Sequence, residues 1–140
     1  MTELTVVVVD DDPFDRELLT ATLEKLEEPV RPLFFTDGVE AAEALENGLH
    51  PDLVLVDLNL PGISGIELIK RLRANASCAA LHLVVLTSSG TSWDARSAYD
   101  AGADAYHVKP FDVHAMRHLL ETTITYWGRL VRRRPGDRMS

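Results

Sequence analysis

Residues 53–65 of the chain read LVLVDLNLPGISG, and the pattern of this stretch is the strongest indication of the fold. Leu53–Val56 is a continuous apolar run, which is typical of a parallel strand buried on both faces. The run stops at Asp57, and Pro61-Gly62 then breaks the chain before a helical pattern begins. The stretch therefore predicts a buried strand over Asp52–Asp57 that ends on a carboxylate.

Three other apolar runs also stop at a polar residue. Val6–Val9 is followed by Asp10 and Asp11, Leu83–Leu86 by Thr87, and Ala105–Val108 by Lys109. Helical patterns lie between the runs, and this alternation predicts βαβ units in an α/β fold with a parallel sheet. The carboxyl ends of parallel strands share one edge, so these polar side chains are expected to meet there. Three carboxylates, a hydroxyl and an ammonium suit a divalent metal and a phosphoryl group.

Turn and cap residues set the remaining boundaries. Strands are expected at Leu4–Asp10, Val30–Phe35, Asp52–Asp57, His82–Leu86 and Asp104–Val108. Helices are expected after the cap or breaker residues Asp12, Asp37, Pro61-Gly62 and Asp112, and a further helix is expected from about Ser92. Pro32 lacks an N–H and therefore places the second strand at an edge of the sheet.

Composition limits the classes of function. A chain of 140 residues holds one domain, and a net charge of −8 argues against general affinity for nucleic acid or membranes. The single Cys78 excludes an internal disulfide and fits a reducing cytoplasm. Basic residues gather at the C-terminus, where a solvated tail is the simpler interpretation and a binding role is the alternative. They are Arg129, Arg132, Arg133, Arg134 and Arg138.

The last predicted helix is long. Its apolar positions continue past Gly128 at helical spacing: Met116, Leu120, Thr123, Trp127 and Val131. We expect a domain over residues 1–126 and a helical extension with a basic tail over 127–140. Trp127 and Leu130 either fold back as a satellite cluster or form an apolar surface for self-association. We favour self-association as a homodimer through this helix, because exposed apolar surface usually marks an interface.

Asp57 has the chemistry of a phosphoacceptor. An aspartate can attack a phosphoryl group and form an acyl phosphate. That reaction depends mainly on stabilising charge on the transferred oxygens, which Lys109 and the Thr87 hydroxyl can do. Mg²⁺ would relieve the repulsion among the carboxylates. Side chains alternate along a strand, so of Asp10 and Asp11 one is expected to bind the metal directly and the other to assist.

The chain resembles the receiver domains of two-component response regulators over about residues 4–125. The matching segments are Val8–Pro13, Asp57–Gly65, Leu86–Ser88 and Tyr106–Phe111. They correspond to the acidic pair, the phosphoacceptor loop, the conserved hydroxyl and the lysine segment of that family. The resemblance implies a flavodoxin-like, five-stranded parallel sheet in the order 2-1-3-4-5 with five helices.

The resemblance also implies roles for individual residues. Asp57 would accept a phosphoryl group from a sensor histidine kinase. Asp11 and Asp57 would bind Mg²⁺ directly, together with the backbone carbonyl of Asn59, while Asp10 would assist.

The resemblance implies roles for three further residues. Thr87 and Lys109 would contact the phosphoryl oxygens, and Thr87 with Tyr106 would form the conformational switch. Family members have a cis peptide at the position of Lys109-Pro110, so one is expected here.

The resemblance narrows the type of regulator. No output domain is expected, so the protein would act as a phosphorelay intermediate, a phosphate sink or an allosteric partner. Pro13-Phe14-Asp15 and the extended C-terminus look like single-domain regulators that work with bacteriophytochrome kinases. We expect a phosphoacceptor rather than an enzyme, with autophosphatase activity as the remaining enzymatic alternative. A haloacid dehalogenase phosphatase would need an acidic residue at the position of Asn59. A pseudo-receiver would have other residues in place of the phosphoacceptor, the acidic pair or the lysine.

Overall fold

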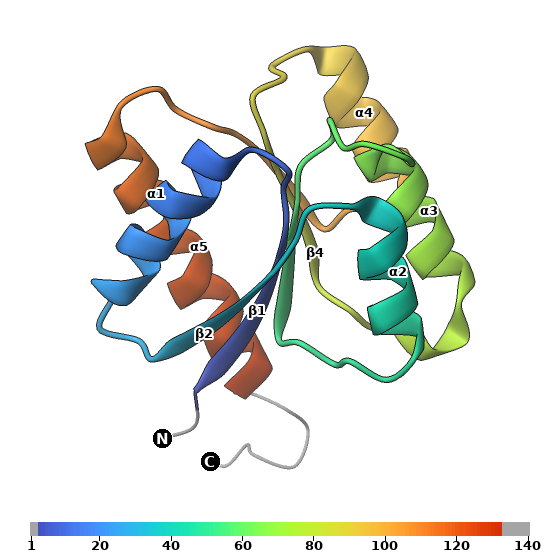
Figure 1. Cartoon of the computed structure of the whole chain (residues 1–140), viewed down its shortest axis with the longest axis horizontal. Coiled ribbons are helices and arrows are strands. Elements are labelled where there is room, and N and C mark those ends of the chain that lie inside the picture. Colours follow the sequence, from blue (N-terminus) through green and yellow to red (C-terminus); the bar gives the residue numbers. More distant parts are fainter. Residues whose placement is uncertain (1–2, 133–140) are drawn as a thin grey trace.

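The computed structural model describes residues 3–132, which form one parallel sheet between two layers of helices (Figure 1). The strands are β1 (Leu4–Val9), β2 (Val30–Phe35), β3 (Leu53–Val56), β4 (Leu83–Thr87) and β5 (Ala105–Val108). The helices are α1 (Pro13–Glu24), α2 (Gly38–Glu46), α3 (Gly65–Ala74), α4 (Ser92–Ala101) and α5 (Val113–Arg132), with a short 3-10 turn η1 (Ala76–Cys78). Each predicted strand and helix is present at nearly its predicted boundaries.

The strand order is β2-β1-β3-β4-β5, and every neighbouring pair is parallel. This confirms the predicted flavodoxin-like sheet. Pro32 lies on the edge strand β2, in register with Val6 of β1. An edge position tolerates a residue without an N–H, because one side of the strand needs no ladder hydrogen bond.

Two apolar cores lie on the two faces of the sheet. Helices α1 and α5 cover one face, and α2, α3 and α4 cover the other (Figure 1). Within β1, Val7 and Val9 join the core under α2 to α4, whereas Val6 and Val8 join the core under α1 and α5. Alternate side chains of a strand point to opposite faces, so a strand covered on both sides must be apolar throughout.

Side-chain caps fix where the helices begin at the carboxyl edge of the sheet. The Asp12 carboxylate accepts from Phe14 N, and the Asp37 carboxylate accepts from Val39 N and Glu40 N, as the sequence predicted. Such caps satisfy amide donors that the first turn of a helix leaves without intrahelical partners. They place the strand-to-helix turns of β1 and β2 at one end of the molecule.

Helix α5 continues without interruption to Arg132, and Trp127 belongs to the domain core. The Trp127 side chain is 9% exposed and its ring centroid lies 5.0 Å from that of His82. The prediction that Trp127 forms part of a self-association surface is therefore wrong. The last turns of α5 lie against the amino-terminal end of β1, where Gly128 approaches the Leu4 side chain. Leu130, by contrast, is exposed.

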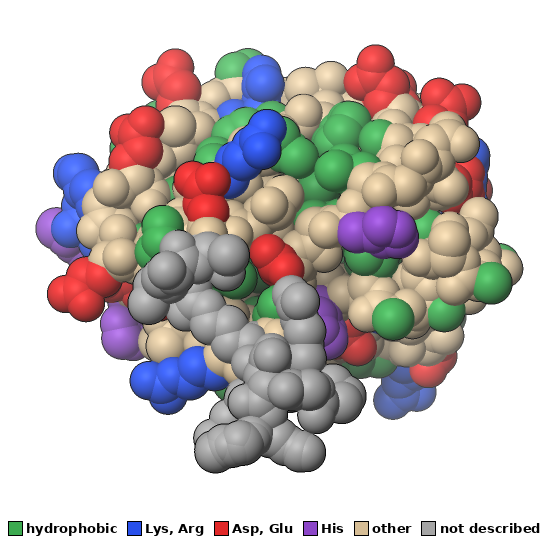
Figure 2. Space-filling view, turned by 90° about the horizontal axis from the view of Figure 1, so that it is seen from below, with side chains coloured by type: hydrophobic (Ala, Val, Ile, Leu, Met, Phe, Trp, Pro, Cys, Tyr) green, Lys and Arg blue, Asp and Glu red, His purple; other side chains and the backbone are tan. Residues whose placement is uncertain are grey.

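The end of the molecule opposite the strand carboxyl ends carries mixed charge. Acidic, basic and histidine side chains are interspersed over the described part of this face (Figure 2). Residues 133–140 and the Arg132 side chain, which include most of the predicted basic tail, lie outside the described residues. No helix within residues 3–132 has the length and apolar character needed to cross a membrane.

Candidate phosphoacceptor and metal site

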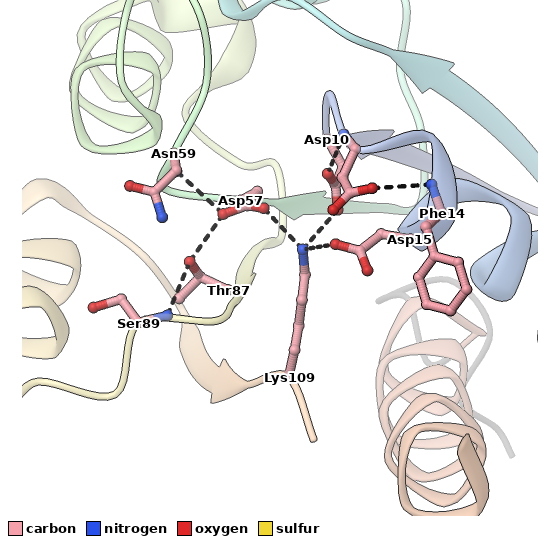
Figure 3. A network of polar contacts seen from close by, with 9 residues as sticks. Asp10, Phe14, Asp15, Asp57, Asn59, Thr87, Ser89 and Lys109 are labelled. Atoms are coloured by element: carbon pink, nitrogen blue, oxygen red, sulfur yellow. Dashed lines mark hydrogen bonds and ion pairs between the residues drawn. The ribbon is translucent and has the colours of Figure 1, made fainter. Parts of the chain in front are cut away.

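Asp57 lies directly after β3 and both of its carboxylate oxygens are engaged (Figure 3). Oδ1 accepts from Thr87 Oγ1 at 2.9 Å and from Asn59 N at 3.1 Å, while Oδ2 accepts from Lys109 Nζ at 2.8 Å. The side chain is 9% exposed. A buried carboxylate needs such partners, and here the donors come from the ends of three different strands or their following loops.

Lys109 follows β5 and joins three carboxylates at one point. Its Nζ lies 2.8 Å from Asp10 Oδ2, 2.6 Å from Asp15 Oδ2 and 2.8 Å from Asp57 Oδ2 (Figure 3). The backbone N–H of Lys109 donates to the Thr87 carbonyl at 2.7 Å, which ties the end of β5 to the end of β4. With one ammonium among three carboxylates, the cluster has a formal charge of −2.

Burial and charge act in opposite directions in this cluster. Burial raises the pKa of the Asp10 carboxyl, although hydrogen bonds from Lys109 and the Asp12 amide oppose the shift. For Lys109, burial lowers the pKa, but the hydrogen bonds to Asp10, Asp15 and Asp57 outweigh it and the pKa is raised. Lys109 is therefore a permanent cation in the folded protein.

Gly65 allows the phosphoacceptor loop to pack against the start of α3. A Cβ atom at this position would lie 2.3 Å from the Asp57 carbonyl oxygen and 2.7 Å from Leu58 Cα. Both atoms belong to the backbone and cannot turn away. The Gly65 N–H donates to the Leu58 carbonyl at 2.9 Å, so the close approach is also a hydrogen-bonded one. The glycine of the Asp57–Gly65 segment thus holds the backbone next to the acceptor.

The acidic cluster differs in one member from the set predicted by sequence. Asp10 and Asp57 meet as expected, but the third carboxylate is Asp15 of α1, and Asp11 is exposed. Alternation of side chains after β1 turns Asp10 into the site and Asp11 outwards, while the first turn of α1 brings Asp15 back over Lys109. The predicted role of Asp11 as a direct magnesium ligand stays a prediction.

A chain of contacts leads from the acceptor to Tyr106. Thr87 Oγ1 donates to Asp57 and accepts from Ser89 N at 3.5 Å. The Tyr106 hydroxyl donates to the Ser89 carbonyl at 2.7 Å, and the Ser89 hydroxyl bonds to the Asp94 carboxylate of α4. The two predicted switch residues are therefore joined through the loop after β4. Sequence spacing alone did not indicate the contacts of Ser89.

The peptide before Pro110 is a further point at which the prediction and the structure differ. Among residues 3–132 no peptide bond is cis, so Lys109-Pro110 is trans and the expected cis bond is absent. A proline amide has only a small intrinsic preference between the two forms, so its local chemistry does not impose cis.

The donor set fits a hard divalent cation. Asp10, Asp15 and Asp57 each offer one oxygen, and these oxygens lie within 4.8 Å of one another. Mg²⁺ binds carboxylate oxygens and keeps several waters, so one or two of these residues suffice. The formal charge of −2 matches the charge of the ion, which makes this edge of the sheet a candidate metal site.

The comparisons with known proteins agree with this geometry. A family model described as the response regulator receiver domain matches residues 6–121. The DNA-binding dual master transcriptional regulator RpaA of Synechocystis is 36% identical over 111 residues, covering 79% of this chain and 45% of RpaA. The chain therefore spans less than half the length of that relative.

Two solved structures show the same fold. The phosphorylated cyanobacterial phytochrome response regulator RcpA aligns with a TM-score of 0.86 at 24% identity, covering 92% of this chain and 96% of RcpA. The receiver domain of the sensor histidine kinase PA1611 from Pseudomonas aeruginosa, with magnesium coordinated in its active site cleft, has a TM-score of 0.74 at 24% identity. That alignment covers 91% of this chain and 99% of the PA1611 domain. Together, the family match, the sheet order and the Asp57–Thr87–Lys109 geometry show that the chain belongs to the response regulator receiver domain family.

Proposed function

We propose that Asp57 accepts a phosphoryl group from the phosphohistidine of a sensor histidine kinase. An Asp57 oxygen attacks phosphorus, the bond from phosphorus to the histidine nitrogen breaks, and an aspartyl phosphate forms. The observation that carries the proposal is the engagement of both Asp57 oxygens by groups that suit phosphoryl oxygens. These groups are the Thr87 hydroxyl, the Asn59 amide and the Lys109 ammonium. Each of these groups can donate a hydrogen bond to an oxygen of the transferred phosphoryl group.

We propose Mg²⁺ as the cofactor. When bound, it would neutralise charge on the phosphoryl oxygens. Asp10 and Asp57 present oxygens to the cluster. Asp11 and the Asn59 carbonyl are the further ligands that the family resemblance implies. Asp11 is exposed and follows Asp10 directly in the chain.

The test is phosphorylation of Asp57→Asn with acetyl phosphate and magnesium, followed by gel retardation and peptide mass spectrometry. We expect the wild-type protein to acquire an acid-labile, hydroxylamine-sensitive phosphate on the peptide containing Asp57, and the variant to acquire none. Asp100→Asn is the matched control, because it removes an exposed carboxylate from α4. Labelling of Asp57→Asn equal to that of the control would refute the assignment.

In this proposal the protein is a phosphoacceptor and not an enzyme, and any autophosphatase activity would act on its own aspartyl phosphate. The exposed Asn59 side chain is an amide, which supplies no general acid for a dehalogenase-type phosphatase. A pseudo-receiver is disfavoured because Asp57, Thr87 and Lys109 are present and in mutual contact.

The conformational response is proposed to pass through Thr87 and Tyr106. A phosphoryl group on Asp57 offers new acceptors to the Thr87 hydroxyl, which would then draw the Ser89 loop towards the site. Tyr106 is half-buried and bonded to the Ser89 carbonyl, so a moving loop must carry the ring along or release it. Such a loop biases two pre-existing arrangements of α4 and β5.

A phytochrome-type kinase is our proposed partner, with a relay or phosphate-sink role for another kinase as the alternative. The likeness in fold to RcpA supports this choice, together with Pro13-Phe14-Asp15 at the start of α1.

We also propose a cytoplasmic location for the protein, and the free, buried Cys78 is consistent with a reducing compartment. Phosphotransfer profiling against purified histidine kinases tests the partner, and a phytochrome kinase is expected to react fastest.

We also propose a homodimer through α5. Tyr126 and Leu130 are 59% and 42% exposed, and they line a shallow groove on the outer face of α5 with His118 and Arg129. Leu130→Arg should shift the protein to the monomer in light scattering, whereas Trp93→Arg on α4 should not. A wild-type protein that is monomeric at every concentration would exclude this dimer.

A further inference from the structure

All three donors of the Lys109 ammonium are already in use. An ammonium has three N–H bonds, and Lys109 Nζ makes three contacts of 2.6–2.8 Å, one to each of Asp10, Asp15 and Asp57. To reach a phosphoryl oxygen, Lys109 must therefore give up one of these contacts. The three carboxylates differ in which other partners could replace Lys109 when a metal or a phosphoryl group binds.

Asp10 and Asp57 have other partners available to them. Asp57 is held by Thr87 and by the Asn59 amide, and Asp10 Oδ1 accepts from the Asp12 amide at 3.0 Å. Both are also candidate ligands of the metal, which would compensate their charge if Lys109 turned away. Neither carboxylate depends on Lys109 alone.

Asp15 is in a different position. Within residues 3–132, Lys109 is the one side-chain partner of its carboxylate, at the shortest of the three distances. Asp15 stands in the first turn of α1, where a negative charge also favours the helix dipole. The dipole requires only a charge in this turn and does not require contact with Lys109. Glu17, two residues further along α1, is exposed, and within residues 3–132 its side chain forms no hydrogen bond or ion pair.

We propose that Asp15 is a positioning residue for Lys109. It keeps the ammonium at the site after Asp10 and Asp57 turn to the metal, and so leaves the other two donors free for phosphoryl oxygens. The proposal rests on the proposed function, because it assigns Lys109 to the phosphoryl group and Asp10 and Asp57 to magnesium. Asp15 also offers an oxygen to the candidate metal site, and the proposal assigns this carboxylate to the lysine and not to the metal.

The experiment measures the Lys109 ammonium directly by NMR in the unphosphorylated protein. The chain has three lysines, Lys25, Lys70 and Lys109, and the first two are exposed. Only a buried, hydrogen-bonded ammonium exchanges its protons slowly enough to give a sharp signal, and Lys109→Met confirms the assignment. Spectra are recorded in EDTA and at saturating magnesium, with the Asn59 amide shift as the measure of metal binding.

We expect the wild-type signal to persist at saturating magnesium. In Asp15→Asn it should persist in EDTA, where Asp10 and Asp57 still hold the ammonium, but magnesium should accelerate its proton exchange about tenfold or more. That factor corresponds to the loss of a charge-assisted hydrogen bond. Glu17→Gln, which removes the same charge from α1, should behave like the wild type. Asp15→Ser provides a second variant in case the amide affects folding, which the dispersion of the amide spectrum reports.

Two results would overturn the role of Asp15. One is a Lys109 signal that survives magnesium in Asp15→Asn as well as in the wild type. The other is loss of the signal in the wild type, which would mean that the metal displaces Lys109 from Asp15 too. In both cases the Asn59 shift still reports metal binding and Asp57 labelling still tests the phosphoacceptor, so the proposed function stands or falls separately.

Discussion

Replacing Lys109 with methionine removes the one cation from a site that holds three carboxylates. The Lys109 side chain is 8% exposed, and those of Asp10 and Asp57 are 3% and 9% exposed. Methionine has a similar length and no charge, so the variant mainly removes the three ion pairs and leaves the packing in place. We expect Lys109→Met to unfold at lower urea concentration than the wild type in the absence of divalent ions.

The size of the effect follows from the burial of the partners. Removing one partner of a buried ion pair typically costs about 3–5 kcal/mol of unfolding free energy. Asp15 is 20% exposed and can be solvated, and Asp57 keeps the hydrogen bonds from Thr87 and the Asn59 amide. We therefore expect the lower end of that range, about 3 kcal/mol at pH 7.

The loss should be smaller at pH 5 than at pH 7. Burial already raises the pKa of Asp10 above its ordinary value of 3.8, and Lys109 opposes that shift. Without Lys109 the folded-state pKa rises further above the unfolded value, so the folded state binds more protons than the unfolded state. Stability then increases as the pH falls through the folded-state pKa of Asp10, which reduces the difference from the wild type.

Magnesium should restore much of the lost stability, because a dication can take the place of the ammonium among the carboxylates. Binding to the folded state adds about 1.4 kcal/mol for each tenfold excess of ion over its dissociation constant. The assay is urea denaturation followed by far-ultraviolet circular dichroism, in EDTA and in magnesium. Lys70→Met, on the exposed side of α3, is the matched control. Equal stability of Lys109→Met and the control in EDTA would contradict the expected role of Lys109, as would a magnesium effect no larger in the variant than in the wild type.

Three further variants test other parts of the structure. Gly65→Ala should destabilise the fold by more than 1 kcal/mol in urea denaturation and slow phosphorylation by acetyl phosphate, because its Cβ would collide with the Asp57 carbonyl oxygen. Trp127→Ala should cost about 3–5 kcal/mol of unfolding free energy, since the side chain is part of the core. Tyr106→Phe should lose about 1 kcal/mol with the hydrogen bond to the Ser89 carbonyl, while the rate of Asp57 phosphorylation stays at the wild-type value.

Each of these variants has a matched control in the chain. Gly90→Ala places a Cβ at ordinary contact distance from Val108, and Trp93→Ala and Tyr99→Phe alter exposed side chains of α4. Controls as unstable as their partners would contradict the packing described. A Trp127→Ala protein of wild-type stability would instead restore the interpretation of Trp127 as a surface residue.

Because Trp127 lies in the core, the dimer is better tested by a point substitution than by truncation of α5. Truncation before Trp127 would remove a core residue, so a change in oligomeric state could follow from unfolding. A point substitution at the exposed Leu130 leaves the core intact and acts only on the outer face of α5.

The sheet, the helix starts and most of the site could be predicted from the residue pattern. Apolar runs identified the strands, because a strand covered by helices on both faces must be apolar along its length. Asp57, Thr87 and Lys109 followed from their places at the ends of those runs, since parallel strands bring their carboxyl ends to one edge. Asp12 and Asp37 were identifiable as caps because capping is a local hydrogen bond between neighbours in the chain.

The positions of Asp15 and Trp127, in contrast, depend on how the helices pack on the sheet. The contact between Asp15 and Lys109 joins residues 94 positions apart, and it depends on the direction in which α1 leaves the sheet. Trp127 is buried because α5 passes over β1, which no periodicity within the helix can specify. A periodic pattern shows that a helix has an apolar face, but whether that face meets its own sheet or a partner depends on where the helix lies. The same holds for charge: the sequence placed an ammonium at the edge of the sheet, and the packing of α1 supplied its third carboxylate.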